Sequence, residues 1–348
     1  MSNIRRIVGA MSGTSLDGLD VALIEVTGTG LAMDVAFIAG SSVPLGSVGD
    51  FLRSFAGGQP ATAAEIAVAS HEFSSLHLHA IRQLLGGSSA DLISIHGQTV
   101  YHRPPVSWQL LQPTPIAHAL GVPVVYDLRQ ADLALNGQGA PLTPIADAIL
   151  LRGRAHPWAV VNLGGFVNVT RGPDTSAHDV CPGNLWLDAL AQRLLDRRFD
   201  ELGQVARLGR VDETWLRELR THQAQVASER RSLGTGDEAL PTLPGLPTPD
   251  LLRTVIEAIA LAIRDASGGA EEILLAGGGR KNETLCSAIT AAVAPAKVLD
   301  FNVTGVPGDY REAAEWAILG ALSQDQESIS LPSVTGGDTP IAGTWIYP

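Results

Sequence analysis

The chain has 348 residues, a formal net charge of −12, 45% apolar residues and 17% charged residues. This length predicts about two domains, each with enough apolar residues to bury a core. No Lys/Arg-rich run provides the basic surface that DNA or RNA requires, so we expect no nucleic-acid partner. A phosphate ligand would have to be held by backbone N–H groups and a metal ion.

The cysteine content and the N-terminus point to an ordinary soluble protein. Cys181 and Cys286 are too few for a disulfide framework or a four-ligand zinc site. The apolar stretch before Ser12 is too short for a signal peptide, and no run of about eighteen apolar residues follows it. We therefore expect a cytoplasmic protein with no membrane partner.

The first half of the chain begins with a predicted β-hairpin. Residues 7–11 form a short apolar run, residues 12–18 form a loop rich in Gly, Ser and Asp, and a second strand passes through Val21, Leu23 and Glu25. The other elements predicted in this half are a helix over residues 61–85 and buried strands over residues 91–95 and 122–126.

The second half also begins with a predicted β-hairpin whose bend consists of small residues. Strands over residues 159–163 and 166–170 flank a bend at Gly164 and Gly165. Later, Thr248 as N-cap and Pro249 at the first position predict a helix, which ends at Gly268-Gly269. The remaining elements predicted here are a strand over 272–276, a helix from Arg311 to about Leu322, and a mobile loop over 223–247 at the mouth of a cleft.

The loop of the first hairpin is the first candidate site. Its residues are Gly13, Thr14, Ser15, Leu16, Asp17, Gly18, Leu19 and Asp20. The glycines let the backbone approach an oxyanion and the hydroxyls add donors. Asp17 and Asp20 can hold Mg²⁺ directly or through water. The alternative is an ordinary polar hairpin loop.

The order of residues in this loop resembles the phosphate loop of the anhydro-N-acetylmuramic acid kinase family, and the resemblance continues to the end of the chain. It is carried by these further blocks: His96-Gly97-Gln98-Thr99 with His102-Arg103-Pro104; Asp127-Leu128-Arg129 with Asp132; 136–142; 162–170; Asp179 with Pro182-Gly183-Asn184 and Asp188; Gly277-Gly278-Gly279 with Asn282; 305–309 with Glu312; Val334-Thr335-Gly336; and Tyr347-Pro348.

The resemblance implies an α/β fold with two actin-like (ribonuclease H-like) lobes around a nucleotide cleft, each with a mixed sheet flanked by helices. It implies an N-terminal lobe of residues 1–135 with the C-terminal segment from about 335 to 348, and a C-terminal lobe of residues 136–334. A homodimer and a place in cell-wall sugar recycling are implied in the same way.

The implied reaction converts ATP, water and 1,6-anhydro-N-acetylmuramic acid to ADP and N-acetylmuramic acid 6-phosphate. Water opens the anhydro bridge at C1 while O6 takes the γ-phosphoryl group. This chemistry requires a carboxylate near C1 to accept a proton from water. It also requires a cradle with Mg²⁺ that aligns the γ-phosphate with O6.

The resemblance also implies residue roles. Asp179 is the candidate catalytic base. In addition to the first loop, the candidate ATP-binding residues are Gly164, Gly165, Asn168, Gly277, Gly278, Gly279 and Asn282. The candidate sugar-binding residues are His96, Gln98, Thr99, Arg129 and Glu312.

Each of these residues has a structural alternative. Asp179 could cap the helix that follows it, and Glu312 could favour a helix dipole. His96 could be a buried, hydrogen-bonded histidine, and Arg129 could form an interlobe ion pair. The glycines at 277–279 could be a simple strand-to-helix turn.

The chain departs from the family pattern on the expected sugar side. Val180 and Cys181 stand beside Asp179 where the family has Thr and Gly. The family's Lys-Ser-Thr-Gly-Arg-Glu loop is represented only by residues 232–238, and residues 109–113 replace an Ile-Gly-Asp turn. Asp147 ends a stretch that normally ends in a histidine.

Three other functions therefore remain open. The first is a kinase for a different anhydro-sugar or amino sugar. The second is a non-catalytic ATP- or sugar-binding paralogue, for which the Val180-Cys181 change is the main support. The third is a glycoside hydrolase with Asp179 and Glu312 as paired carboxylates, which leaves the Gly13–Asp20 loop unexplained.

Overall fold

The computed structural model describes residues 4–13, 16, 18–228, 233, 237, 239–338 and 340–348, with the side chains of 226–228 outside the description. The chain forms two compact units, unit 1 with Met1–Arg152 and Thr304–Pro348, and unit 2 with Gly153–Val303. These bounds differ from the expected boundaries at residues 135 and 335. Helices α5 (Pro144–Leu150) and α10 (Arg311–Gln324) pack in unit 1 rather than with the second half, because α10 lies against strands of the first sheet.

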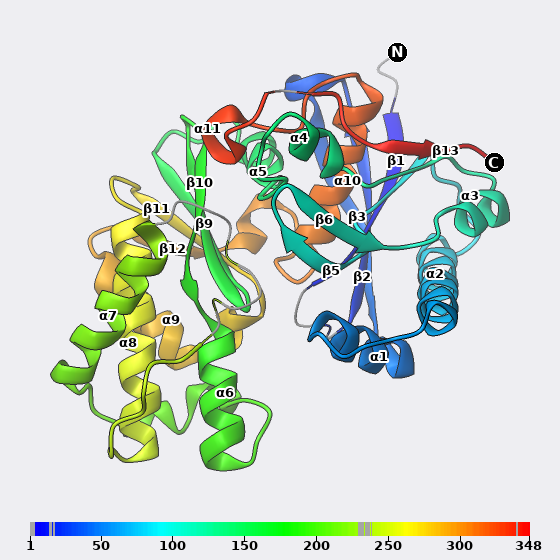
Figure 1. Cartoon of the computed structure of the whole chain (residues 1–348). Helices are drawn as coiled ribbons and strands as arrows, with labels where there is room; N and C mark the ends of the chain where they lie inside the picture. Colours follow the sequence, from blue (N-terminus) through cyan, green and yellow to red (C-terminus); the bar gives the residue numbers. More distant parts are fainter. Residues whose placement is uncertain are drawn as a thin grey trace. The chain divides into compact units, whose positions relative to one another are not determined.

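Unit 1 is built on a mixed sheet, which in the described residues has six strands in the order β13-β7-β4-β1-β2-β3 (Figure 1). Its strands are β1 (Ile4–Ser12), β2 (Leu19–Thr27), β3 (Asp34–Val43), β4 (Leu92–Ile95), β7 (Val124–Tyr126) and β13 (Thr344–Ile346). A separate antiparallel hairpin consists of β5 (Gln98–Arg103) and β6 (Val106–Leu110). The other helices of the unit are η1 (Gly30–Ala32), α1 (Gly46–Ala56), α2 (Ala63–Leu85), α3 (Thr114–Leu120), α4 (Gln130–Ala134) and α11 (Pro332–Thr335).

Helices cover both faces of this sheet, as Figure 1 shows for α2 and α10. Val8 and Ala10 of β1 share a core with Phe73 of α2. Because successive strand residues point to opposite faces, Gly9 faces α10. A Cβ atom on Gly9 would lie 1.8 Å from the Ala313 carbonyl oxygen, so only glycine permits this approach of helix to strand.

The predicted helix over residues 61–85 is α2, and its start is fixed locally. Thr62 and Glu65 form a capping box, in which the Thr62 side chain accepts from the Glu65 N–H and the Glu65 carboxylate accepts from the Thr62 N–H. The predicted strands over 91–95 and 122–126 are the shorter β4 and β7.

Unit 2 holds a sheet that in the described residues has five strands, in the order β10-β9-β8-β11-β12 (Figure 1). They are β8 (Trp158–Leu163), β9 (Phe166–Gly172), β10 (Ser176–Pro182), β11 (Glu272–Ala276) and β12 (Lys297–Asp300). Its helices are α6 (Asn184–Leu195), η2 (Glu201–Gly203), η3 (Ala206–Leu208), α7 (Glu213–Ser228), α8 (Thr248–Ala266), η4 (Gly278–Lys281), α9 (Glu283–Val293) and η5 (Phe301–Thr304). The main core joins α6, α7, α8 and α9 to one face of the sheet.

Two predictions in the second half were wrong in detail. Thr248 is the first residue of α8, and Pro247 occupies the N-cap position, where it has no side-chain cap to offer. The expected loop over 223–247 begins within α7, which continues to Ser228 because its apolar face packs beside α8.

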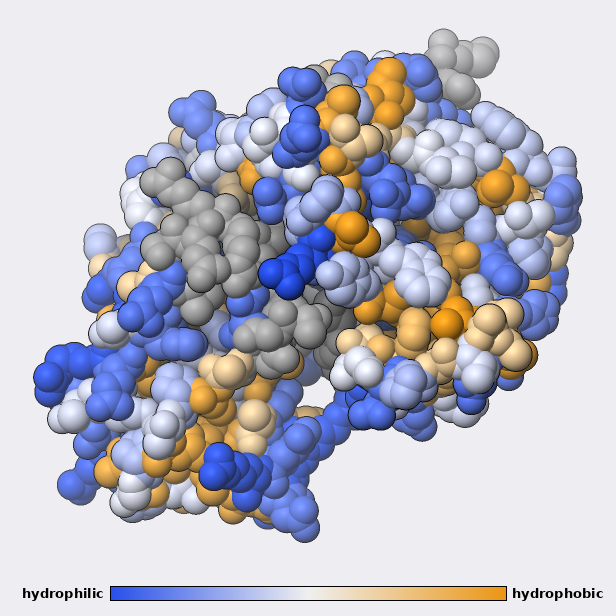
Figure 2. Space-filling model, in the orientation of Figure 1, coloured by the Kyte–Doolittle hydropathy of each residue, from blue (hydrophilic) through white to orange (hydrophobic). Residues whose placement is uncertain are grey.

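The fold class is confirmed as α/β, with mixed sheets flanked by helices in both units. Among the described residues, no helix is both long and apolar enough to span a bilayer. Figure 2 shows apolar residues at the surface near the β5–β6 hairpin and α1, where Val106 is 57% exposed.

Candidate active site

The predicted phosphate loop joins β1 to β2 in unit 1. Thr14, Ser15 and Asp17 lie outside the described residues. The Leu16 N–H donates to the Gly13 carbonyl over 3.1 Å, and Leu16 has a φ of 53°, so the chain turns sharply here. Gly18 leaves little room for a side chain, since a Cβ atom there would lie 3.2 Å from the Val43 carbonyl oxygen.

The loop ends where β2 begins, with Leu19 buried in the core and Asp20 half-buried. Asp20 lies opposite Met11 in the β1–β2 ladder. Its Oδ1 accepts a hydrogen bond from the Ser42 hydroxyl of β3. The carboxylate is therefore oriented by the neighbouring strand, at the end of the sheet where the loop emerges.

His96 and Arg129 meet in unit 1, after the ends of the parallel strands β4 and β7. Arg129 donates from Nε and Nη2 to His96 Nε2, over 3.1 and 2.9 Å. Burial and the adjacent guanidinium hold the pKa of His96 well below 6.5, so the imidazole is neutral with its proton assigned to Nδ1. The Trp316 ring of α10 packs 4.6 Å from the His96 ring, centroid to centroid. The predicted sugar-binding pair is thus brought together, and His96 is also the buried histidine of the alternative interpretation.

Gln98 and Thr99 lie on the β5–β6 hairpin, close to His96 in sequence. Gln98 is 1% exposed, and its Oε1 has no hydrogen-bond partner among the described residues. The Gln109 amide donates to the Thr99 hydroxyl over 3.3 Å and to the Ser107 hydroxyl over 2.8 Å. The segment that departs from the family pattern therefore contacts the predicted sugar loop directly.

Two polar residues of this region were not among the predicted site residues. Asp127 has a φ of 53°, and its Oδ1 is buried without a partner among the described residues, which raises the pKa of the carboxyl. Burial and Arg129 lower the pKa of His102 to about 4. The sequence signal for Asp127 is its place immediately after a buried strand, where parallel strands collect functional groups.

Unit 2 aligns three polar side chains across neighbouring strands. Asn162 of β8 pairs with Asn168 of β9, and Asn168 pairs with Asp179 of β10. Val167 and Val169 point into the core, so these paired residues project from the opposite face of the sheet. Asp179 Oδ2 accepts from the Leu233 N–H over 2.7 Å. Asp179 is therefore a strand residue, and the alternative in which it caps the next helix is wrong, because Gly183 occupies the N-cap of α6.

The predicted glycine turns of unit 2 lie against each other. The carbonyl oxygens of Gly164 and Gly165 accept from the N–H groups of Asn184 and Gly183 at the start of α6, over 3.0 and 2.7 Å. A Cβ atom on Gly279 would lie 2.8 Å from Leu163 Cβ, just before this hairpin bend. The bend is therefore packed between α6 and the turn after β11.

The turn after β11 has a backbone that only glycine adopts readily. Gly277 has a φ of 80°, and a Cβ atom there would lie 2.7 Å from Asn162 Oδ1. Gly278 has open space where a side chain would be. Asn282 caps α9 by accepting from the Leu285 N–H over 3.0 Å. Bare backbone beside open space suits a flat ligand such as a nucleoside, and the simple turn interpretation fits as well.

Glu312 lies in the first turn of α10, beside a buried ion cluster that sequence reasoning missed. Arg311 donates to both oxygens of Asp147, over 2.9 and 2.7 Å from Nη2. Glu315 Oε1 lies 2.7 Å from Arg311 Nε. Burial raises the pKa of Glu315 well above 4.5, and the charge of Asp147 adds to this effect. The departure at Asp147 is thus explained by its pairing with Arg311.

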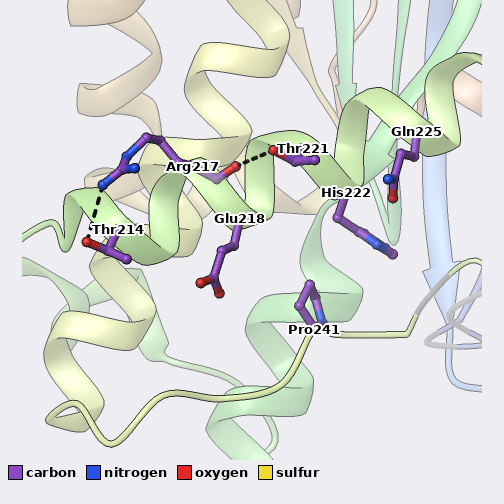
Figure 3. A pocket seen from close by; sticks show the side chains of 7 residues that line it. All are labelled: Thr214, Arg217, Glu218, Thr221, His222, Gln225 and Pro241. Atoms are coloured by element: carbon purple, nitrogen blue, oxygen red, sulfur yellow. Dashed lines mark hydrogen bonds between the residues drawn. The ribbon is translucent and has the colours of Figure 1, made fainter.

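A shallow depression of about 360 Å³ lies on unit 2, away from these residues. Figure 3 shows that its lining comes mainly from the polar face of α7, including Arg217 and His222, with Pro241 from the following segment. Arg217 donates to Thr214 Oγ1 over 3.4 Å. No predicted site residue lines this depression.

The described residues contain no group of three or more His, Cys, Asp or Glu side chains that could enclose a metal ion. Of the two predicted metal-binding carboxylates, Asp20 is described and Asp17 lies outside the described residues; a single carboxylate can hold only a cation that keeps most of its water and phosphate ligands.

Comparison with known proteins covers almost the whole chain. The model of the anhydro-N-acetylmuramic acid kinase family matches residues 5–348. The anhydro-N-acetylmuramic acid kinase of Rhizorhabdus wittichii is 35% identical over 97% of this chain and 97% of its own length. That of Brucella canis is 33% identical over 99% of this chain and 98% of its own.

Among solved structures, this chain is similar to component A of (R)-2-hydroxyglutaryl-CoA dehydratase from Acidaminococcus fermentans. The identity is 11%, the TM-score is 0.46, and the alignment covers 91% of this chain and 98% of the other.

Proposed function

Since this chain belongs to the anhydro-N-acetylmuramic acid kinase family, we propose that it uses ATP and water to convert 1,6-anhydro-N-acetylmuramic acid to N-acetylmuramic acid 6-phosphate and ADP. The observation that carries this proposal is the match to the kinases of the family over nearly the full length of both chains. Because these relatives are kinases, a simple glycoside hydrolase is the weaker interpretation for this chain.

Asp179 is the proposed base of this reaction. The water oxygen bonds to C1 as the C1–O6 bond breaks, and the proton of the water passes to the Asp179 carboxylate. O6 bonds to the γ-phosphorus, and the bond from that phosphorus to the leaving oxygen breaks to give ADP. The Leu233 N–H holds Asp179 Oδ2, and this contact orients the carboxylate without neutralising it.

The nucleotide is proposed to contact the glycine turns of both units. The Gly13–Asp20 loop would hold the phosphates through its N–H groups, and Gly277, Gly278 and Gly279 would accept the nucleoside against bare backbone. Asp17 and Asp20 would hold Mg²⁺, directly or through water. When bound, the ion neutralises charge on the transferring phosphoryl group.

The departures beside Asp179 do not argue for an inactive paralogue. Val180 and Cys181 are buried in the core of unit 2. Burial raises the pKa of the Cys181 thiol to about 12, so it stays a neutral, unreactive side chain. Because they point into the core, these residues change packing rather than the face that carries Asp179.

A kinase for a different sugar is the second candidate. It is favoured by the contact of Gln109, in the departing segment, with Thr99 of the proposed sugar loop. His96, Gln98, Arg129 and Glu312 are proposed to complete the sugar site. Turnover with a panel of anhydro-sugars and amino sugars separates this candidate from the first.

The assembly and location are proposals from family membership alone. We expect a cytoplasmic homodimer, and the net charge of −12 supports the absence of nucleic-acid partners. Light scattering after size exclusion measures the oligomeric state.

The decisive experiment measures ADP release from Mg-ATP with and without 1,6-anhydro-N-acetylmuramic acid, and identifies the product by mass. We expect ADP only with the sugar, and a product heavier by one water and one phosphoryl group. Asp179→Asn should lower kcat by a factor of about 10²–10⁴ while ATP binding is retained. Asp174→Asn, an exposed carboxylate between β9 and β10, is the matched control. Sugar-independent ADP release, or full activity of Asp179→Asn, contradicts the proposal.

A further inference from the structure

The C-terminal segment of unit 1 is joined to the loop that follows α4 by a buried carboxylate. Asp132 is 0% exposed and Thr335 is 1% exposed. Thr335 Oγ1 donates to Asp132 Oδ1 over 2.7 Å, and the Gly139 N–H donates to Asp132 Oδ2 over 2.7 Å. Both oxygens of one buried carboxylate therefore bind groups from segments about two hundred residues apart in the sequence.

Two further contacts hold the same segments together. The Gln138 N–H donates to the Thr335 carbonyl over 2.9 Å. The backbones of Gly137 and Gly337 are in contact, since a Cβ atom on Gly337 would lie 2.7 Å from Gly137 Cα. The loop at 136–139 therefore has no room to shift while the C-terminal segment is in place.

The loop at 136–139 also contacts Arg129 through Gly139. Gly139 makes two hydrogen bonds with its backbone. Its N–H donates to Asp132 Oδ2, and its carbonyl oxygen accepts from Arg129 Nη1 over 2.8 Å. The other guanidinium nitrogens of Arg129 donate to His96 Nε2. A continuous chain of hydrogen bonds thus runs from Thr335 through Asp132 and Gly139 to the Arg129 guanidinium.

We propose that Asp132 and Thr335 are positioning residues, which fix the Arg129 guanidinium through Gly139 and so set the affinity for the sugar. The inference rests on the proposed function, because Arg129 is there a sugar-binding residue. A guanidinium presents its donors in a rigid plane, so a small rotation of Arg129 misaligns every donor at once. Asp132 and Thr335 are buried, so they can affect the sugar only through the residues that they position. Their effect should therefore appear in the KM for the sugar and spare the KM for ATP.

The test is Thr335→Val, which keeps the shape of the side chain and removes the hydroxyl donor. We expect the KM for the sugar to rise about tenfold while the KM for ATP stays within about twofold. Thr335→Ser restores the hydroxyl and should restore the KM for the sugar. Gly337→Ala displaces the same loop by contact with Gly137, and should raise the KM for the sugar in the same way.

Matched controls separate positioning from general loss of stability. Thr254 is 0% exposed and its hydroxyl also donates, to the Asp250 carbonyl over 2.7 Å, but it lies in unit 2. Thr254→Val should lower Tm without changing the KM for the sugar. Gly245→Ala, where a Cβ atom meets nothing within 4 Å, is the control for Gly337→Ala.

A second readout does not depend on turnover. Side-chain ¹⁵N spectra of the wild type should show His96 neutral with Nε2 as the acceptor, and Thr335→Val should shift the Nε2 resonance because the contact with Arg129 loosens. An unchanged KM for the sugar together with an unchanged Nε2 resonance overturns the inference. A wild type without kinase activity, but with the Nε2 shift, would instead contradict the proposed function and leave the positioning network supported.

Discussion

In the buried cluster of Arg311, Asp147 and Glu315 in unit 1, we expect the two carboxyl groups to contribute unequally to stability. Arg311 is 2% exposed, and Asp147 and Glu315 are each 0% exposed. One guanidinium charge faces two carboxyl groups, and burial raises the pKa of Glu315 well above 4.5. Asp147 contacts the guanidinium through both of its oxygens, whereas Glu315 contacts it through Oε1 and is the carboxyl that burial makes easier to protonate.

Asp147→Asn should accordingly destabilise unit 1, and Glu315→Gln should change its stability little. Removing one partner of a buried pair costs about 3–5 kcal/mol. We expect the lower end, about 3 kcal/mol, because Glu315 can ionise once the charge of Asp147 is gone. Glu315→Gln puts a neutral amide of the same size in place of a carboxyl whose ionisation burial already disfavours, and should cost about 1 kcal/mol or less.

Calorimetry at pH 7 measures the difference. For a unit of this size, about 3 kcal/mol corresponds to a fall in Tm of roughly 6–12 °C. Asp34→Asn is the control, since Asp34 also pairs with an arginine, Arg152, but its side chain is 81% exposed; it should shift stability by no more than about 0.5 kcal/mol. Equal losses for Asp147→Asn and Glu315→Gln would refute the unequal contribution of the two carboxyl groups.

Three further predictions concern the nucleotide turn and the pH dependence of stability. In Gly277→Ala, the alanine must adopt a φ of 80° and place its Cβ 2.7 Å from Asn162 Oδ1. The KM for ATP should therefore rise about tenfold or more, while the KM for the sugar stays unchanged. An unchanged KM for ATP would show that this turn is not part of the ATP site. Burial lowers the pKa of His77 to about 4, so the folded state binds a proton less readily than the unfolded state. Stability should therefore be full above pH 6.5 and fall by about 3 kcal/mol toward pH 4; urea titrations of His77→Gln should lack this contribution, and an identical slope would contradict it. Burial raises the pKa of Asp188 to about 6, so its stabilising contribution is lost as the pH rises from 3.8 through 6. The free energy of unfolding of Asp188→Asn at pH 8 should thus exceed that of the wild type, by at most about 1 kcal/mol after solvent screening. A variant less stable than the wild type would show that the ionised carboxylate has a partner.

Some of the fold and site follows from local sequence alone. Thr62 and Glu65 specify the start of α2 because a capping box needs only neighbouring residues. Gly277 indicates the turn after β11 because its backbone conformation is nearly confined to glycine. The order of small and acidic residues from Gly13 to Asp20 was the first sign of the family, and the blocks that follow it along the chain extended the resemblance.

Local rules also misled at the start of α8, where a Thr-Pro-Asp sequence predicts Thr248 as N-cap. The backbone instead turns helical one residue earlier, and the Asp250 carboxylate accepts from the N–H of Arg210 in a distant segment. This tertiary contact of Asp250 cannot be seen in the local pattern.

The sequence by itself determined the family, the hairpins that open the two halves, the glycine turns and helices α2, α8 and α10, because each depends on residues close together in the chain. Only the tertiary structure decided that Arg311 pairs with Asp147, that Asn168 aligns with Asp179, and that Thr335 reaches Asp132. These contacts depend on strand register and on how α10 and the C-terminal segment pack. A buried charge or donor finds its partner only after the core has excluded water, and the partner can come from any part of the chain.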